Sequence, residues 1–320
     1  QDPINKVRGM VLQGTNESNL EGALTKENFS IVYADLLDAA SLRDACKNID
    51  IIYHLAAIVS DWGAENLFMS IIFQGTKNLA EAAIENGVKR IIYMSSVTVH
   101  GFDDHVNANE DTPYNPIPFF PYSKAKIKAE SLLLELEDTD KIKVVIIRPG
   151  FDIIGSRHTL GVYQMAKAIE EGKFGVIDNG KKLISLVYVK NLVAAMVYLA
   201  DIESASGEAY IVSDVSWSWA KYMEAYCSRL GCRVPKLSVP FWLLAPFVRF
   251  IEAIYKLFKI KQPPLLTRYR ITVPHHDLDF SSKKLNKTGF KPPYTIQEGL
   301  DDAINWYLEY KKHIGETKSE

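Results

Sequence analysis

The 320-residue sequence contains only three cysteines, Cys46, Cys227 and Cys232, and none has a second Cys or His pair at zinc spacing. A low, odd count favours free thiols in a reducing, cytoplasmic compartment over a disulfide framework. His275 and His276 have no acidic or histidine partner at metal-ligand spacing, so we expect no metal site. No basic block exceeds a few residues and the net charge is −2, which gives nucleic-acid binding no electrostatic support.

The sequence also lacks an apolar run long enough to span a bilayer. The nearest candidate is the segment 239–261, whose uncharged stretch before Arg249 is about a dozen residues. Its inner charges fall at helical spacing on one stripe: Arg249, Glu252, Lys256 and Lys259. Two compatible interpretations follow. The segment covers an apolar substrate pocket, or it makes peripheral membrane contact with Trp242 and the phenylalanines inserted.

Strand-like and helix-like runs alternate through the first 150 residues, the pattern of parallel βαβ units. The pattern predicts strands near 6–12, 30–34, 49–55, 88–95 and 142–148. It predicts helices near 38–47, 65–86 and 120–138. Beyond Gly155 the alternation loosens, and aromatic residues gather between 215 and 260. We therefore expect an α/β fold with a doubly wound parallel sheet and a smaller C-terminal lobe.

The most informative chemistry lies at two places, Ser95-Ser96 and the Tyr122-to-Lys126 stretch. The serines end an apolar strand-like run, and open α/β sheets build their sites at the carboxyl ends of strands. Tyr122 and Lys126 stand four apart on a predicted helix, so they share one face. An ammonium beside a phenol lowers the pKa of the phenol, which suits proton transfer during alcohol/ketone interconversion. The alternative is a surface tyrosine among solvated lysines.

Several ordered motifs give the chain a resemblance to a known family. They are Ala34–Asp38, His54–Ala57, Gly75–Leu79, Ser95-Ser96, Tyr122–Lys126, Arg148–Gly150, Val187–Leu192, Pro263–Tyr269, Asp279-Phe280 and Glu298–Tyr307. In this order and spacing they resemble an extended short-chain dehydrogenase/reductase of the NAD-dependent epimerase/dehydratase superfamily. The 3β-hydroxysteroid dehydrogenase-like branch is the most similar. The resemblance implies a Rossmann-type domain, an NAD or NADP cofactor and catalysis by hydride transfer.

Three departures from the family pattern matter. The family begins with a strand, a Gly-x-x-Gly-x-x-Gly turn and a helix, whereas the first strand-like run here, 6–11, resembles its second strand. We expect that about 30 residues of the first β–α unit are absent, and hence that the chain as written binds cofactor weakly. A divergent member that folds without this unit is the alternative. Ile72 replaces the usual asparagine, and Leu12 or Gln13 leaves the choice between NAD and NADP open.

The resemblance also implies residue roles. Tyr122 is the general acid/base, Lys126 lowers its pKa and bonds the nicotinamide ribose, and Ser96, rather than Ser95, polarises the substrate oxygen. The cofactor residues are Tyr122 and Lys126 with Asp35 and Leu36 at the adenine, Leu55, Ala56 and Ala57 along the phosphates and ribose, and Pro149 behind the nicotinamide. Competing structural roles are a turn for Asp35, a strand end for His54 and the core for His100.

We therefore predict an NAD(P)-dependent oxidoreductase acting on an apolar small molecule, steroid-like, terpenoid or lipid. The alternatives are a nucleotide-sugar epimerase/dehydratase and a non-catalytic cofactor- or lipid-binding member. The predicted domains are 1–155 with 183–202 for the cofactor and 156–182 with 203–320 for the substrate. A homodimer through the helices near 65–86 and 120–138 is a further expectation of the resemblance.

Overall fold

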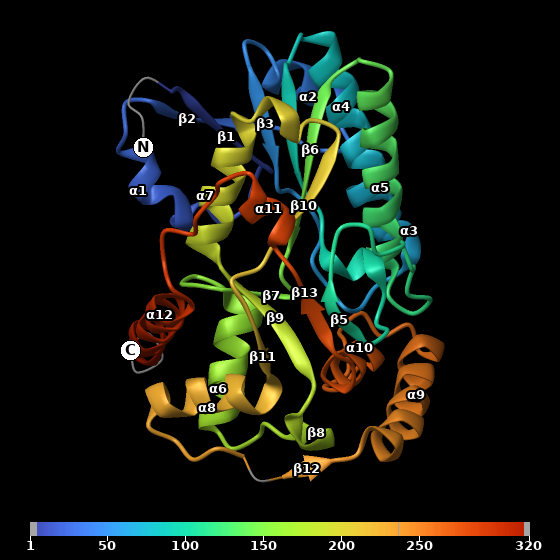
Figure 1. Cartoon of the computed structure of the whole chain (residues 1–320), viewed down its shortest axis with the longest axis vertical. Coiled ribbons are helices and arrows are strands. Elements are labelled where there is room, and N and C mark those ends of the chain that lie inside the picture. The colour runs from blue at the N-terminus through green and yellow to red at the C-terminus, as the bar shows by residue number, and fades with distance from the viewer. Residues whose placement is uncertain (1–4, 236, 317–320) are drawn as a thin grey trace.

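The structure is a computed structural model that describes residues 5–235 and 237–316. Its upper half in Figure 1 is built on a four-stranded parallel sheet of order β10-β6-β4-β3. These strands are β3 (Ile51–His54), β4 (Arg90–Met94), β6 (Lys143–Pro149) and β10 (Glu208–Val212). The predicted α/β class with a parallel sheet is confirmed.

Helices cover both faces of this sheet because successive side chains of its buried strands point to opposite sides. Ile91 and Val144 join one core with helices α2 (Ala39–Ala45), α4 (Gly75–Glu85) and α5 (Pro121–Asp138). Ile92 and Val145 join another with α7 (Val189–Ala200). A four-residue helix α3 (Glu65–Phe68) and a π-helical turn (Met69–Gln74) lead directly into α4. The predicted helix 65–86 is thus three consecutive segments.

The first two strands, β1 (Val7–Val11) and β2 (Phe29–Tyr33), pair in parallel as a separate two-stranded sheet. Between them run a 3₁₀ turn and the short helix α1 (Glu21–Leu24). Within the described residues β1 pairs only with β2, and β3 only with β4. Each of β1 and β3 therefore has one edge whose backbone groups take part in no strand ladder.

The lower half contains a second, mixed sheet of order β11-β9-β13-β5, with β7 also paired to β9. Its strands are β5 (His105–Ala108), β7 (Asp152–Ile154), β9 (Leu183–Tyr188), β11 (Val215–Ser218) and β13 (Leu278–Phe280). The short strands β8 (Val176–Ile177) and β12 (Ser238–Val239) pair separately. The helices here are α6 (Gln164–Glu170), α8 (Trp219–Leu230), α9 (Phe241–Leu257), α10 (Arg268–Thr272) and α12 (Ile296–Glu316), whereas α11 (Lys283–Lys287) packs on β10 of the first sheet.

This topology differs from the domain boundary expected at 183–202. The expected strand forms as β9 but pairs in the second sheet, while the helix after it, α7, packs on β4 and β6 of the first. Conversely β10, expected in the substrate lobe, occupies the edge of the first sheet beside β6. An apolar run such as Leu183–Tyr188 predicts a buried strand, but it carries no information about which ladder the strand joins.

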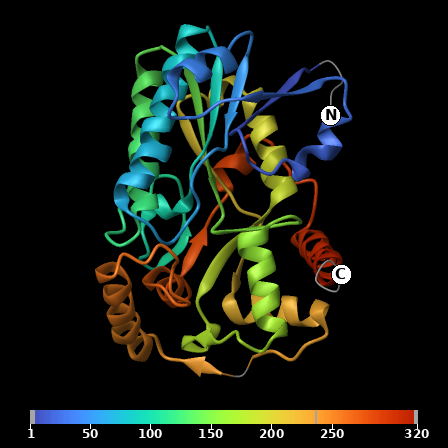
Figure 2. The ribbon, with the colours of Figure 1, turned by 180° about the vertical axis from the view of Figure 1, so that it is seen from behind.

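Helix α9 lies at the periphery of the molecule in both views (Figures 1 and 2). It packs against α10, and its buried side chains are few: Ala245, Val248 and Glu252. No helix in the described ranges is both long and apolar enough to cross a membrane.

Candidate active site

Strand β4 and helix α5 bring the three predicted catalytic residues together. Strand β4 ends at Met94, and Ser96, two residues on, caps the following 3₁₀ turn. Helix α5 begins with Pro121, a residue suited to the first helical position because its missing N–H needs no partner there. One turn later, the Lys126 ammonium donates a hydrogen bond of 2.6 Å to the carbonyl of Met94. This bond fixes the start of α5 against the strand end that carries Ser96.

Ser96 and Tyr122 lie within reach of each other. The Ser96 hydroxyl accepts hydrogen bonds from the backbone N–H of Thr98 at 3.1 Å and from its hydroxyl at 2.9 Å. Hydrogen bonding to Ser96 lowers the pKa of the Tyr122 phenol, but burial raises it more, so its pKa lies above the usual value. Tyr122 nevertheless keeps part of its surface accessible. The pair forms a proton donor with a fixed neighbouring hydroxyl.

Lys126 behaves differently from the expectation that it lowers the pKa of Tyr122. Its ammonium lies 5.6 Å from the Tyr122 ring centroid and 4.6 Å from that of Tyr93. Burial lowers the pKa of Lys126 to about 7, against the opposing charge of Glu130. At this pKa the amine exchanges a proton near neutrality. The direction of the Tyr122 shift is therefore set by desolvation, which the helical spacing alone does not predict.

Ser95 belongs to a separate, buried network. Its hydroxyl donates to Glu130, which also binds the Arg148 guanidinium at 2.6 Å and the Tyr114 hydroxyl at 2.7 Å. Arg148 further contacts Nε2 of His100 at 3.3 Å. Burial beside Arg148 lowers the pKa of His100 to about 4. Ser95 and His100 are thus engaged in this buried network. Ser96 remains as the serine next to Tyr122.

A second buried polar group, centred on His54 at the end of β3, was not predicted as part of the site. Nε2 of His54 lies 2.9 Å from the hydroxyl of Thr76, which itself donates to the carbonyl of Ile72. Burial and the charge of Lys126 lower the pKa of His54 to about 3, so the ring is neutral. Nearby, the buried hydroxyl of Tyr93 has no hydrogen-bond partner within the described part of the chain. The ring centroids of His54 and Tyr93 lie 5.4 Å apart.

The adenine pair expected after β2 divides into an exposed and a buried residue. Asp35 is exposed and accepts a hydrogen bond from the backbone N–H of Leu37 at 2.9 Å. Leu36 is buried against Gly75, where a Cβ would come within 2.9 Å of it. The glycine is therefore required by this close approach, which holds the turn after β2 against α4.

The other expected cofactor residues follow the ends of two parallel strands. Leu55 and Ala56 are exposed directly beyond β3, with Ala57 half-buried behind them. Pro149 is the buried last residue of β6. Small or apolar residues at the carboxyl ends of strands are typical of the cofactor edge in this kind of sheet.

Tyr122 is surrounded by an aromatic cluster, which we define as Phe102, Phe119, Phe120, Phe151 and Tyr269. The Phe120 ring lies 5.4 Å from that of Tyr122 and 4.5 Å from that of Tyr269. The neighbouring cations are already neutralised: Arg268 pairs with Glu252 at 2.6 Å and Arg270 with Asp61 at 2.8 Å. The surroundings of the phenol are thus apolar and carry no unpaired cation from α10.

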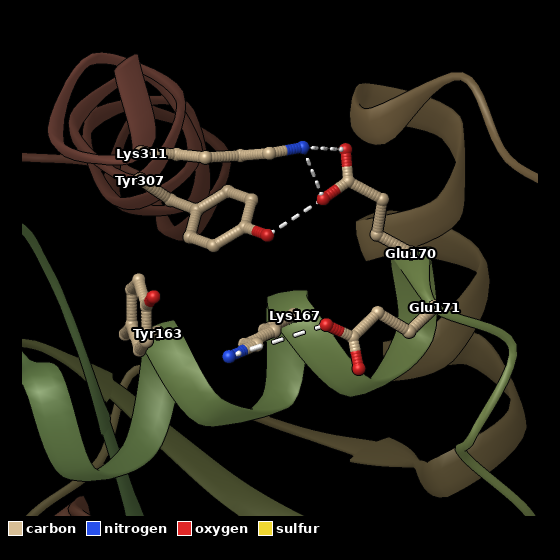
Figure 3. Close-up of a pocket in the computed structure, with 6 residues that line it drawn as sticks. All are labelled: Tyr163, Lys167, Glu170, Glu171, Tyr307 and Lys311. Atoms are coloured by element: carbon tan, nitrogen blue, oxygen red, sulfur yellow. Dashed lines mark hydrogen bonds and ion pairs between the residues drawn. The ribbon is translucent and has the colours of Figure 1, made fainter. Parts of the chain in front are cut away.

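A surface hollow of about 350 Å³ lies elsewhere, between α6 and α12, and is drawn in Figure 3. Its charged lining pairs internally. Lys311 bonds Glu170 at 2.7 Å, the Tyr307 hydroxyl bonds the same carboxylate, and Lys167 faces Glu171. None of the predicted catalytic residues lines this hollow. We attribute it to the packing of α12 on α6 and not to the active site.

Comparison with known proteins yields one family. The model of the NAD dependent epimerase/dehydratase family matches residues 6–213. A 3beta-hydroxysteroid-dehydrogenase/decarboxylase, isoform 1, of Arabidopsis thaliana is 30% identical over 94% of this chain and 72% of its own length. An N-acetyl-alpha-D-glucosaminyl-diphospho-ditrans,octacis-undecaprenol 4-epimerase of Escherichia coli O157:H7 is 29% identical over 87% of this chain and 83% of its own.

The fold has solved counterparts as well. The crystal structure of UDP-glucuronic acid 4-epimerase from Bacillus cereus in complex with NAD superposes with a TM-score of 0.73. The match covers 95% of this chain and 91% of that one, at 19% sequence identity. At this identity the likeness establishes the Rossmann-type fold alone.

Proposed function

Because the chain belongs to the NAD-dependent epimerase/dehydratase family, we propose that it is an oxidoreductase that interconverts a secondary alcohol and a ketone on an apolar substrate. The arrangement of Ser96, Tyr122 and Lys126 at the end of β4 carries this proposal. Its cofactor is a nicotinamide dinucleotide, which supplies or accepts the hydride when bound. The sequence does not select between NAD and NADP.

The residues present fit such a dinucleotide at its two ends. Asp35 is exposed after β2, and Leu55 and Ala56 are exposed beyond β3. There Asp35 and Leu36 would contact the adenine, while Leu55 to Ala57 would line the phosphates and ribose. Lys126, tied to the carbonyl of Met94, and Pro149, at the end of β6, would hold the nicotinamide half. The buried amine of Lys126 would bond the ribose hydroxyls.

The chain's own groups would move the proton. In reduction, the Tyr122 hydroxyl would give its proton to the carbonyl oxygen of the substrate, and in oxidation it would take the proton back. Ser96 would donate a hydrogen bond to the same oxygen, because its lone pairs already accept from Thr98. Assistance of this type contributes about 10²–10⁴-fold to the rate.

The aromatic cluster supports an apolar substrate. Phe120 packs against both Tyr122 and Tyr269, and the cations of α10 are neutralised by Glu252 and Asp61. A sugar diphosphate bound at this place would need cations free to pair with its phosphates. A steroid-like, terpenoid or lipid ketone would instead bury its apolar surface against the rings.

A second candidate function is supported by the Escherichia coli relative, whose name describes a 4-epimerase of a sugar carried on a diphospho-undecaprenol. The same three residues would serve transient oxidation of the sugar, followed by return of the hydride. A polyprenyl tail would also satisfy the apolar surroundings.

Nicotinamide fluorescence and product analysis separate these functions. The purified protein is incubated with NADH or NADPH and, in parallel, with ketosteroids, β-ketoacyl compounds, UDP-sugars and polyprenyl-diphosphate sugars. We expect net consumption of the reduced cofactor with an apolar ketone and its loss in Tyr122→Phe. Sugar interconversion without net consumption would replace the proposal with the epimerase. Cofactor binding without turnover on any substrate would favour a non-catalytic member.

The expected homodimer is also a proposal. It would use α4 and α5, with the neighbouring α3, which packs on α5 and leaves Leu67 exposed. Light scattering would give twice the monomer mass, and Leu67→Glu would lower the dimer's stability. A monomer at all concentrations would contradict it.

A further inference from the structure

Helix α9 and the segment that follows it expose large apolar side chains, the reverse of an ordinary surface helix. Trp242 is 73% exposed, Phe250 66% and Leu265 87%. Other large side chains on this surface are also exposed: Leu243, Phe247, Leu257, Phe258 and Leu266. Isolated exposed apolar residues are common in proteins, but gathered aromatic and aliphatic side chains of this size mark an interaction surface. We call the exposed residues of 241–266 the α9 surface.

The α9 surface has charge of one sign. Glu252 is the only acidic residue between 237 and 266, and it is buried. Its carboxylate accepts from the backbone N–H and the guanidinium of Arg268, each at 2.6 Å. The exposed charges of the α9 surface are therefore all basic: Arg249, Lys256, Lys259 and Lys261.

Together, these properties favour a membrane as the binding partner of the α9 surface. Trp and Phe beside Lys and Arg on one face are typical of helices that lie in the headgroup region. With 17 residues and Pro246 in its interior, α9 is suited to lying on a bilayer and not to spanning it. A symmetric contact between two copies would set four cations against four, which disfavours self-association.

We propose that the α9 surface docks the protein on membranes that contain anionic lipid, with Trp242, Phe247 and Phe250 inserted and the basic residues at the headgroups. The surface is firmly joined to the rest of the molecule. Trp62, in the loop after β3, donates from Nε1 to the carbonyl of Ile260 at 3.2 Å. Arg268, held by Glu252, stacks on Phe119 at 4.9 Å.

The docked surface adjoins the aromatic cluster around Tyr122. Arg268 is followed in the chain by Tyr269, which packs on Phe120. An apolar substrate dissolved in the bilayer would therefore reach the site through this side of the molecule. This second step rests on the proposed function, whereas docking itself does not.

Vesicle flotation tests the docking without cofactor or substrate. The protein is mixed with vesicles of phosphatidylcholine alone, or of phosphatidylcholine and phosphatidylglycerol in equal parts. We expect it to float with the anionic vesicles and to bind neutral ones far more weakly. Neutralising two cations in Lys259→Gln/Lys261→Gln should weaken anionic binding roughly 25-fold, since each is worth about fivefold near the surface.

Apolar insertion is tested by Trp242→Ser/Phe250→Ser, which should weaken binding about tenfold or more on anionic vesicles. Both side chains are exposed, so the fold should survive, and circular dichroism verifies this. The matched control is Val193→Ser/Val197→Ser, two exposed valines of α7, which should bind like the parent protein. Tryptophan fluorescence should shift to the blue with anionic vesicles, and the shift should be lost in Trp242→Phe.

Several results would overturn the proposal. These are failure to float with either vesicle, equal binding by the Trp242/Phe250 variant, or a stable self-association that the same variant abolishes. Specific capture of a protein partner by the α9 surface, with no vesicle binding, would equally replace it. Vesicle flotation measures no turnover, so failure of the oxidoreductase assay would leave the docking proposal intact. Failure of the docking would likewise leave the proposed function intact.

Discussion

The Arg148 guanidinium and the Glu130 carboxylate form an ion pair of 2.6 Å in which both side chains are buried. The pair joins strand β6 to helix α5, and its carboxylate also accepts a hydrogen bond from Ser95. Removing one partner of a buried pair leaves an uncompensated charge.

Arg148→Met should therefore lower the free energy of unfolding by about 3–5 kcal/mol. The measurement is urea unfolding followed by circular dichroism. The control is Arg43→Met, which breaks an exposed pair with Glu85 at 3.9 Å and should change stability by less than about 1 kcal/mol. Equal effects of the two variants would contradict a structural role for the buried pair.

Ser95 and Ser96 should differ in their effect on catalysis. Ser96→Ala removes a donor to the substrate oxygen and an acceptor for Thr98, so kcat should fall about 10²-fold while stability falls by about 1 kcal/mol. Ser95→Ala leaves the Glu130 carboxylate one hydrogen bond short and should cost about 1–3 kcal/mol of stability while kcat is retained. The reverse assignment of effects would move the catalytic role to Ser95.

Tyr122→Phe removes the proton donor while it preserves the ring that packs on Phe120. We expect kcat to fall by about 10²–10⁴-fold with the substrate KM nearly unchanged. Tyr269→Phe, in the same aromatic cluster, is the matched control and should change kcat only a few-fold. Steady-state kinetics of both variants test this role. A comparable loss of kcat in the two variants would mean that the loss reflects altered packing and not the missing proton donor.

Lys126 should give the rate a pH dependence near neutrality. Burial lowers its pKa to about 7, so the ammonium is present below that pH and is lost above it. Because a charged Lys126 would bind the nicotinamide ribose more strongly than the neutral amine, kcat/KM for reduction should fall as the pH rises through about 7. This decrease with pH should be absent in Lys126→Met, whose rate should be low at every pH. A parent profile that is flat between pH 6 and 8 would contradict this role.

The sequence could indicate the three proposed catalytic residues because each depends on local geometry. Tyr122 and Lys126 share a helix face through their spacing of four, and Ser96 follows a strand whose apolar run is continuous. The residues that tune them come from elsewhere in the chain. Glu130 meets Arg148 because α5 packs on β6, and the sequence does not encode that packing locally.

Desolvation is the other property that the sequence does not predict. The spacing of Tyr122 and Lys126 favours an acidified phenol, but burial, with Phe120 packed against the ring, raises the pKa of the phenol. Likewise His54 is an ordinary strand-end residue in the sequence, and only the fold brings it to Thr76 and near the charge of Lys126. A polar residue at a strand end that has no partner at a regular spacing in the sequence gives no signal of such a contact.

The burial of His54 predicts how stability depends on pH. The folded pKa of about 3 lies below the ordinary 6.5, so below pH 6.5 the unfolded chain binds a proton that the folded one does not. Stability contributed by the neutral ring is thus complete above about pH 6.5 and is lost as the pH falls toward 3. Between pH 6 and 4 this group should contribute about 1.4 kcal/mol per pH unit. Urea unfolding of His54→Asn across this range should show a slope flatter by that amount. Thr76→Val, which keeps the imidazole but removes its hydroxyl partner, should retain most of the slope, since burial is the larger cause of the shift. An unchanged slope in His54→Asn would mean that the ring is protonated in the folded protein, and its buried contact with Thr76 would then be wrong.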